Sequence, residues 1–562
     1  MSPASSSSNN SPDSPDPTGD FTHGTAAAPP DAAIVQRRIA RAATVTAIGN
    51  ISSRIVGLVA VAVRTYFFGN SPAASAFELA ANIPTIFNDL LAGGMLSSAL
   101  VPTFSSYTTS PGDKNGPHKL AEFGQLLGAL ITLATLALIV VVGLLLVLEK
   151  PLASVITLGR NQDLGLLTSL LRTTIPAILF MNLSGIMTAA LFARHKFAYT
   201  AFTATAFNVV MIVCIVLFAP QLGATALGVG LLAGSFVQMA MQWPGLRDVP
   251  IKLSFNWRHP GLAQIIKLFL PVAGGLVLAQ LAAQLSFTVA NVISAEGPAT
   301  MRYAAQVIQF PLGLVVVAVS SAILPTLSAQ ALSVRAGVAA LHDFKTTLAQ
   351  GLRLVIFLIV PSAIGLWILA RPILALLFER GAFTAVSTAY TVPALQAAIF
   401  GLVFAAIDQP LIFSFYALRD TRTPTLIGLA STIFYLAWLG GLGMLWHNNL
   451  RDFTLFDLIL ANSLKTGVDA LLMGLFLARK IQGLETLRAG PLLTKIGLSS
   501  GLMGLAVWLV STLLTARVGV NSFSAHAIVA MGSALVGLLV YIAAARLLRM
   551  DELALLRNMV RR

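Results

Sequence analysis

The chain has 562 residues, of which 56% are hydrophobic and only 10% are charged, and its formal net charge is +14. So large an apolar fraction exceeds what one water-soluble core can bury. The apolar runs are continuous rather than alternating, which excludes a membrane β-barrel. Most Lys and Arg residues stand in short loops and at the ends of apolar runs, a pattern typical of membrane orientation and not of nucleic-acid binding. We therefore expect an all-α polytopic membrane protein.

The N-terminal segment 1–36 is rich in Ser, Pro and Asp and has no apolar period, so we expect a disordered cytoplasmic tail. Arg37, Arg38 and Arg41 then precede the first apolar run. A secretory or twin-arginine signal is one interpretation of this pattern. We favour an uncleaved first helix whose basic flank stays inside, because the run is long and lacks a clean small-residue cleavage site.

About 14 stretches of the chain are long and apolar enough to cross a bilayer as helices. In chain order they are expected near residues 40–67, 75–106, 120–148, 164–193, 198–218, 222–243, 262–294, 300–330, 346–370, 386–417, 423–446, 456–478, 492–515 and 524–547. Placing both termini in the cytoplasm puts most Lys and Arg in the inner loops, as membrane insertion favours. The loops are too short to hold a separate catalytic domain.

Two near-copies of sequence indicate that the membrane domain consists of two related halves. Residues 97–106 read SSALVPTFSS, and residues 320–329 read SSAILPTLSA. A helix followed by a basic turn likewise ends at 190–201 and again at 414–427. The offset corresponds to six helices, so the two halves should have the same orientation and pseudo-symmetric folds. Such pairs of lobes often enclose a transport site, which favours a carrier over an enzyme or a receptor.

We accordingly divide the chain into four parts, which are the tail 1–36, a first lobe at 37–245 with helices 1–6, a second lobe at 246–480 with helices 7–12, and helices 13–14 with a basic C-terminus at 481–562.

Charged side chains inside apolar runs are candidates for a functional or a pairing role, because placing one in hydrocarbon costs roughly 2.5–3.5 kcal/mol. Arg54 lies in the middle of the first expected helix, and its planar guanidinium suits a diphosphate. Glu78 and Asp89 lie three helical turns apart on one face of the second helix. They could bind a proton or a cation, or they could pair structurally with Arg54.

The second half also carries charges within its apolar runs. Asp408 precedes Pro410, whose kink exposes backbone carbonyls, so Asp408 could contact cargo or an ion. Lys465 and Asp469 are four residues apart on one helix face. They could form a self-neutralising pair within the helix or part of a cation site.

Motifs for metal-dependent hydrolysis and for ATP binding are missing from the sequence, so we expect no cofactor and no metal. The single cysteine, Cys214, lies in an apolar run and is expected to be a small core- or lipid-facing residue.

Several longer motifs carry a resemblance to a known family. They are SRIVG at Ser53–Gly57, FG at Phe68–Gly69, SSALVP ending at Pro102, FPLGLVVVAVSSAILPTLS at Phe310–Ser328, LLFERGAFTA at Leu376–Ala385 and FYALRDTRTP at Phe415–Pro424. In these motifs the chain resembles the MurJ/MviN family, which comprises lipid II flippases of the multidrug/oligosaccharidyl-lipid/polysaccharide exporter superfamily. The resemblance implies a plan of six, six and two helices in the bacterial inner membrane.

The resemblance also implies that the protein moves lipid II, an undecaprenyl-diphosphate-linked muropeptide, from the inner to the outer leaflet for cell-wall synthesis. The driving force would be the membrane potential or an ion gradient, and the protein would act as a monomer. On this basis the residues expected to contact cargo are Arg54, Arg64, Asn82, Asn88 and Gln306. Those expected to serve an ion or line the cavity are Glu78, Asp89, Asp408, Lys465 and Asp469.

The chain departs from the family at several positions. Ala60, Asn88, Asp89 and Gln306 stand where the family carries arginine, Ser75 stands where it carries aspartate, and Gly93 stands where it carries glutamate. Of the family's cavity cations Arg54 remains in place, so we expect Arg64 to turn into the same cavity and to share its role. Two other functions stay open from sequence. The protein could export another lipid-linked oligosaccharide or amphipathic cargo, or it could be a membrane scaffold that transports nothing.

Overall fold

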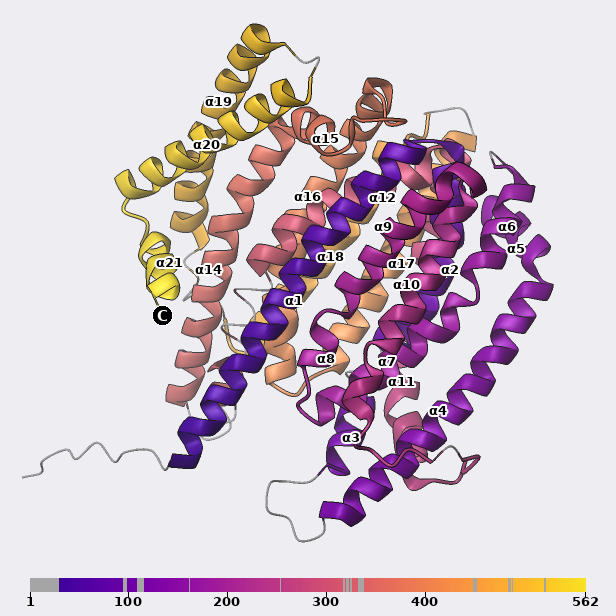
Figure 1. The fold of residues 1–562 in the computed structure, drawn as a ribbon. Coiled ribbons are helices and arrows are strands. Elements are labelled where there is room, and N and C mark those ends of the chain that lie inside the picture. The colour runs from indigo at the N-terminus through magenta and orange to yellow at the C-terminus, as the bar shows by residue number, and fades with distance from the viewer. Residues whose placement is uncertain are drawn as a thin grey trace, which may run out of the picture.

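The computed structural model describes residues 30–93, 99–108, 116–160, 162–252, 254–316, 326–331, 338–447, 452–483, 489–519 and 522–561, together with the single residues 319, 323 and 487. The fold is all-α, as the sequence predicts (Figure 1). Within the described residues, 12 helices are long and apolar enough to cross a membrane. The expected count of about 14 is not reached because the spans expected near 75–106 and 300–330 are divided into shorter helices.

The first half of the chain runs from α1 to α10. Its elements are α1 (Pro30–Phe68), α2 (Pro72–Phe87), η1 (Asn88–Gly93), α3 (Val101–Ser106), α4 (Gly116–Val147), α5 (Glu149–Thr157), α6 (Leu164–Thr174), α7 (Ala177–Ala193), α8 (Ala198–Ala201), α9 (Thr203–Leu222) and α10 (Thr225–Ala240). Helix α1 begins before the expected boundary at 36, and residues 1–29 of the expected tail lie outside the described residues.

The second half and the C-terminal helices follow in the same manner. The elements are η3 (Trp243–Leu246), α11 (Pro260–Ile293), α12 (Gly297–Pro311), η4 (Leu312–Val316), α14 (Val338–Ile368), α15 (Ala370–Phe378), α16 (Ala385–Ala417), α17 (Arg422–His447), α18 (Leu455–Lys480), α19 (Ala489–Val518), α20 (Phe523–Leu547) and α21 (Asp551–Arg561). Figure 1 shows α19–α21 in yellow, beside α14 and at the edge of the bundle.

The two halves share unusual local features at matching positions. Each has a short stretch of π-helix, at Asn88–Gly93 and at Leu312–Val316, directly after a helix with a proline near its end. Each also has a nine-residue helix, α5 or α15, that follows a long apolar helix. A π-helical turn is rare, so its recurrence at the same offset supports our proposal that the halves are related.

The turns that follow α7 and α16 match as well. His195 and Arg419 both adopt a left-handed backbone, with φ of 56° and 58°. In each turn the next amide donates to a carbonyl five residues back, at 2.9 Å, which is a common way to end a helix. Pro325 lies outside the described residues, so its expected equivalence to Pro102 stays a prediction.

Each of these turns is fixed by an ion pair to a residue 54 or 60 positions further along the chain, but the charges are reversed. Arg194 of the first turn pairs at 2.7 Å with Asp248, just past the boundary at 245, and Lys196 adds a second contact to Asp248 at 2.9 Å. These cations, Arg194 above all, hold the pKa of the Asp248 carboxyl well below its usual range. In the second half the acid is on the turn, and Asp420 pairs with Lys480.

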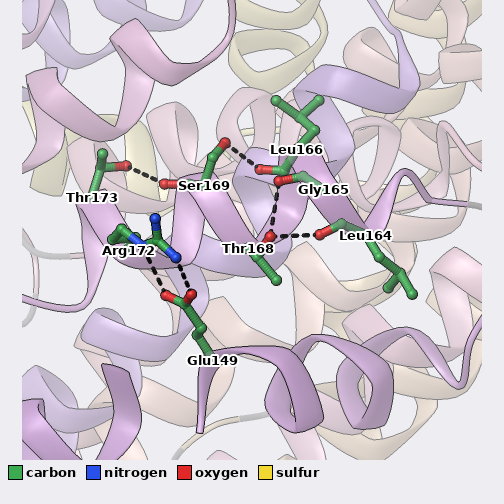
Figure 2. A network of polar contacts seen from close by, with 8 residues as sticks. All are labelled: Glu149, Leu164, Gly165, Leu166, Thr168, Ser169, Arg172 and Thr173. Carbon is green, nitrogen blue, oxygen red and sulfur yellow. Dashed lines mark hydrogen bonds and ion pairs between the residues drawn. The ribbon is translucent and has the colours of Figure 1, made fainter. Parts of the chain in front are cut away.

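The hairpin of α5 and α6 is held by an ion pair at the edge of the first half. Figure 2 shows Arg172 of α6 reaching Glu149 at the start of α5 with two contacts, one of them Nε to Oε2 at 3.2 Å. The same view shows the hydroxyls of Thr168, Ser169 and Thr173 donating to backbone carbonyls of their own helix. Hydroxyl groups on this apolar helix thus satisfy their hydrogen bonds locally.

We predict that His195→Gly and Arg419→Gly each stabilise the protein by a similar amount. A left-handed backbone costs a non-glycine residue about 1 kcal/mol, and glycine removes this cost. The thermal midpoint of the purified protein should rise for both variants, while His195→Ala and Arg419→Ala should give no gain. A gain at only one turn would contradict the equivalence of the two turns.

Candidate functional site

Arg54 of α1 contacts the second half of the chain through a motif distant in sequence. Its Nη1 donates to the backbone carbonyl of Gln309 at 2.8 Å. A Cβ atom on Gly313 would lie only 1.9 Å from Arg54 Cζ, so a side chain at that position would displace the guanidinium. The SRIVG and FPLG motifs therefore meet in space, and the glycine of the second makes room for the arginine of the first.

Glu78 of α2 forms the central charge contact between the halves. Its carboxylate is only 3% exposed and receives two guanidiniums. Arg64 of α1 places Nη1 at 2.6 Å from Oε1, and Arg302 of α12 places Nε at 2.8 Å from Oε2. One carboxylate between two guanidinium cations leaves an excess of one positive charge among these three side chains. Breaking a buried pair of this kind costs about 3–5 kcal/mol, so the three side chains hold α1, α2 and α12 together.

Polar contacts join the halves around the end of α1. Gly69 accepts a hydrogen bond from Tyr303 at 2.9 Å, and the amide of Ala382 donates to the carbonyl of Tyr66 at 2.8 Å. Gly69 has φ of +61°, and a Cβ there would lie 2.3 Å from the carbonyl oxygen of Ala382. The FG and FERGAF motifs of the two halves thus pack closely enough to require glycine at position 69.

Further side-chain pairs extend this contact between the halves. Asn82 donates to Gln284 at 2.7 Å, and Asn70 donates to Thr300 at 2.8 Å. The amide of Ala299 donates to the Ser75 hydroxyl at 3.2 Å. Polar side chains that hydrogen-bond across the interface make its closure specific.

A cavity of about 310 Å³ lies within the second half, between α11, α12, α16, α17 and α18. Arg302 and Gln309 line it on α12, where they are also bound by Glu78 and Arg54. Across the cavity Ser286 and Tyr435 share a hydrogen bond of 2.6 Å. The cavity therefore begins directly beside the charged junction of the two halves.

A second group of charges lies between α16, α17 and α18. Asp408 is buried, and its carboxylate lies within electrostatic range of that of Asp469. Asp469 accepts a hydrogen bond from the Ser431 hydroxyl at 2.9 Å, and Lys465 lies within electrostatic range one turn away. Asp408 of α16 thus joins Lys465 and Asp469, which are neighbours on α18, in one cluster.

The structure groups the ten residues expected at the site into distinct places. Arg64 meets Glu78, and Asn82 lies in the interface between the halves. Arg54 binds a backbone carbonyl, whereas a pair with Glu78 or Asp89 was the alternative expected from sequence. Asn88 and Asp89 begin the π-helix and share a hydrogen bond of 3.4 Å.

Two residues of α12, Gln306 and Arg302, also bear on the expected site. Gln306 lies half-buried, one turn beyond Arg302. Sequence reasoning missed Arg302 itself, which binds Glu78 across the interface. The signal was present, since Arg302 is a charge near the start of an apolar run, but its partner lies 224 positions earlier in the chain. Among the described residues, no three His, Cys, Asp or Glu side chains are grouped so that they could hold a metal ion.

Comparison with known proteins places the chain among membrane transporters. The sequence model described as "Lipid II flippase MurJ" matches residues 65–529. A probable lipid II flippase MurJ of Vibrio cholerae is 30% identical over 407 residues, which cover 71% of this chain and 76% of the relative. A probable lipid II flippase MurJ of Haemophilus influenzae is 29% identical over 477 residues, covering 81% and 89%.

Two solved structures show the same fold. A lipid II flippase MurJ in an inward closed conformation matches with a TM-score of 0.74 and 23% identity, covering 90% of this chain and 99% of that one. An inward-facing multidrug resistance MATE family transporter of the MOP superfamily matches with a TM-score of 0.59 and 13% identity, covering 78% and 99%.

We predict that Gly313→Ala destabilises the protein only when Arg54 is present. The added Cβ would overlap the guanidinium and break its bond to Gln309, so the loss should be about 1–3 kcal/mol. In an Arg54→Ala background the same change should have little effect. Thermal unfolding of the four proteins measures this coupling, and Gly365→Ala is the control because a Cβ there meets open space. Equal losses in both backgrounds would refute the contact.

Proposed function

The chain belongs to the MurJ family of lipid II flippases, and on this basis we propose that it moves lipid II from the inner to the outer leaflet of the bacterial inner membrane. It is thus a transporter and not an enzyme. We propose that lobes 37–245 and 246–480 rock against each other, with helices in 481–562 beside them, and that a single chain suffices. A membrane potential or an ion gradient would drive the cycle.

The excess of guanidinium groups at the junction of the halves supports a diphosphate cargo. Arg54, Arg64 and Arg302 face this region, where Glu78 is the buried acid among the described residues and the exposed Asp89 lies within electrostatic range of Arg302. A diphosphate carries about two negative charges, and charge-assisted hydrogen bonds to guanidinium are among the strongest that proteins make. We propose that the diphosphate binds Arg54 and Arg302 and competes with Glu78 for them.

Arg64 and Arg302, which bind Glu78, lie close to two positions at which this chain lacks an arginine that the family carries. Arg64 lies four residues after Ala60 on α1, and Arg302 lies four residues before Gln306 on α12. The two helices run in opposite directions, so both shifts move the charge by about one turn toward the same end of the bundle. We propose that this chain keeps the two cations but has them one turn closer to the end at which α1 terminates.

The contacts of Gly69, Asn70, Asn82 and Tyr303 support a state closed at that end. With the N-terminus in the cytoplasm, this is the outer end, and cargo would enter from the inner leaflet. Opening the outer end requires these hydrogen bonds and the Arg302 contact to Glu78 to break. Cargo that takes Arg302 from Glu78 would lower the cost of that step.

We predict that proteoliposomes containing the protein translocate labelled lipid II and that Arg54→Ala and Arg302→Ala each slow this strongly. A hydrogen bond to a charged group is worth about 1.5–3 kcal/mol, which corresponds to roughly tenfold to hundredfold in rate. Arg517→Ala, at the end of α19, is the matched control and should be neutral.

Other outcomes of this assay separate the competing functions. If wild type is inactive and Ala60→Arg gains translocation, the chain handles a different cargo. If wild type, Arg54→Ala and Arg302→Ala translocate lipid II equally, the diphosphate-binding role of these arginines is wrong.

We predict that both termini face the cytoplasm. After Cys214→Ser, a cysteine at Ser522, between α19 and α20, should react with a membrane-impermeant reagent in intact cells, whereas one at His195 should react only after lysis. Both positions are exposed in the structure. The opposite labelling pattern would reverse the orientation.

A further inference from the structure

The cavity of the second half leads from the junction of the lobes toward the carboxylate cluster. On α16 its lining includes Gly401 and Ala405, and on α18 it includes Asn462 and Thr466. Asp408 follows Ala405 by three residues, and Asp469 follows Thr466 by three residues. Residues three apart lie on the same side of a helix, so both carboxylates lie about one helical turn beyond these lining residues.

The environment of Asp408 favours the protonated form of its carboxyl group. Its residue is only 7% exposed, and within the described part of the chain its Oδ1 has no hydrogen-bond partner. An ionised carboxylate left without donors in an apolar interior is costly. The ionised form of Asp469 is better stabilised, because this carboxylate accepts a hydrogen bond from Ser431 and lies near the Lys465 ammonium.

We propose that Asp408 and Asp469 share one proton and that this proton is the ion that couples to cargo movement. This proposal rests on the proposed flippase function. The proton passes from water in the cavity to an Oδ atom of Asp408, which then donates to a carboxylate oxygen of Asp469. Lys465 keeps its own proton. The loaded cluster is then neutral, with one ammonium, one carboxylate and one carboxylic acid, and the unloaded cluster carries one negative charge.

The composition of the cluster favours a proton over a metal cation. Two facing carboxylates resist being ionised together, and one shared proton relieves the repulsion. Sodium or a divalent ion would need several more oxygen ligands, and Lys465 beside Asp469 would repel it. Within the described residues, no three acidic, imidazole or thiol side chains converge here.

The other charged groups on the helices around α16 are engaged elsewhere or exposed. Tyr416 of α16 itself lies within electrostatic reach of Asp408. On the described parts of the packed helices, Arg302 binds Glu78, Arg353 binds Glu552, Lys480 binds Asp420, Asp457 caps α18 and Lys345 bonds the Gln482 carbonyl. His342, Asp343, Arg371, Arg422 and Arg479 are exposed. The protonation of Asp408 therefore depends mainly on the charges of Asp469 and Lys465.

The position of the cluster explains how protonation could reach the cargo site. The same cavity is also lined by Arg302 and Gln309, which contact Glu78 and Arg54. A negative charge about one helical turn beyond the lining of a low-dielectric cavity attracts the Arg302 guanidinium away from Glu78. Loading the proton removes this attraction, so protonation and the closed junction favour each other.

Infrared difference spectroscopy of the purified protein tests the proton site without transport. Wild type should show a buried carboxylic-acid band at mildly acidic pH that disappears as the pH rises. Asp408→Asn should lose this band, and Asp343→Asn should keep it, because Asp343 is exposed. A wild type without the band, or an unchanged band in Asp408→Asn, would overturn the proposal. A band that sodium removes at constant pH would point to a metal ion and also overturn it.

Translocation in proteoliposomes then tests the coupling. Lipid II movement by wild type should respond to an imposed pH gradient, and Asp408→Asn should move lipid II without that response, since the amide imitates the protonated acid. An equal response in both proteins refutes the coupling while leaving the flippase function intact. Absence of lipid II movement in wild type refutes the flippase function, and the infrared band still decides whether the proton site exists.

Discussion

The two halves of this protein meet around one buried carboxylate that binds a guanidinium from each half. Glu78 and Arg64 belong to the first half, and Arg302 belongs to the second. Because an isolated buried charge costs several kcal/mol, the approach of α12 toward α2 is set by this contact as much as by apolar packing. The glycine at 69, the amide pairs and the FERGAF loop fit around it, and the cavity of the second half opens beside it. A transporter that must separate its halves repeatedly gains from such a contact, since charge exchange can release it.

Much of the architecture follows from the sequence. The length of the apolar runs predicts most of the helices, and the recurrence of SSALVPTFSS as SSAILPTLSA predicts two halves. The motifs that carried the family resemblance turn out to be contact points, with Arg54 against Gly313 and Gly69 against Ala382. A single sequence shows that such residues are present but not which of them touch.

The parts that could not be predicted depend on long-range geometry. Arg302 was overlooked because its partner Glu78 lies in the other half, and pairing across 224 positions leaves no periodic signal. The spans near 75–106 and 300–330 were expected as continuous helices, but π-helical turns interrupt both, and run length alone cannot reveal a change in helical hydrogen bonding. From sequence, Lys465 and Asp469 could form a pair within one helix or part of a cation site, and the approach of Asp408 from another helix was not expected.

The reversed ion pairs behind the two matching turns have a consequence for assembly of the chain. Halves that descend from one ancestral unit could in principle dock each other's turns, because the backbone of the turn at His195 and that at Arg419 are alike. In the structure Arg194 pairs with Asp248, and Asp420 pairs with Lys480. A crossed pairing would instead place Arg194 against Lys480 and Asp420 against Asp248. Like charges in contact disfavour that arrangement. The charge reversal thus favours, as the chain is inserted, the pairing of each turn with its own ion-pair partner over the partner of the other turn.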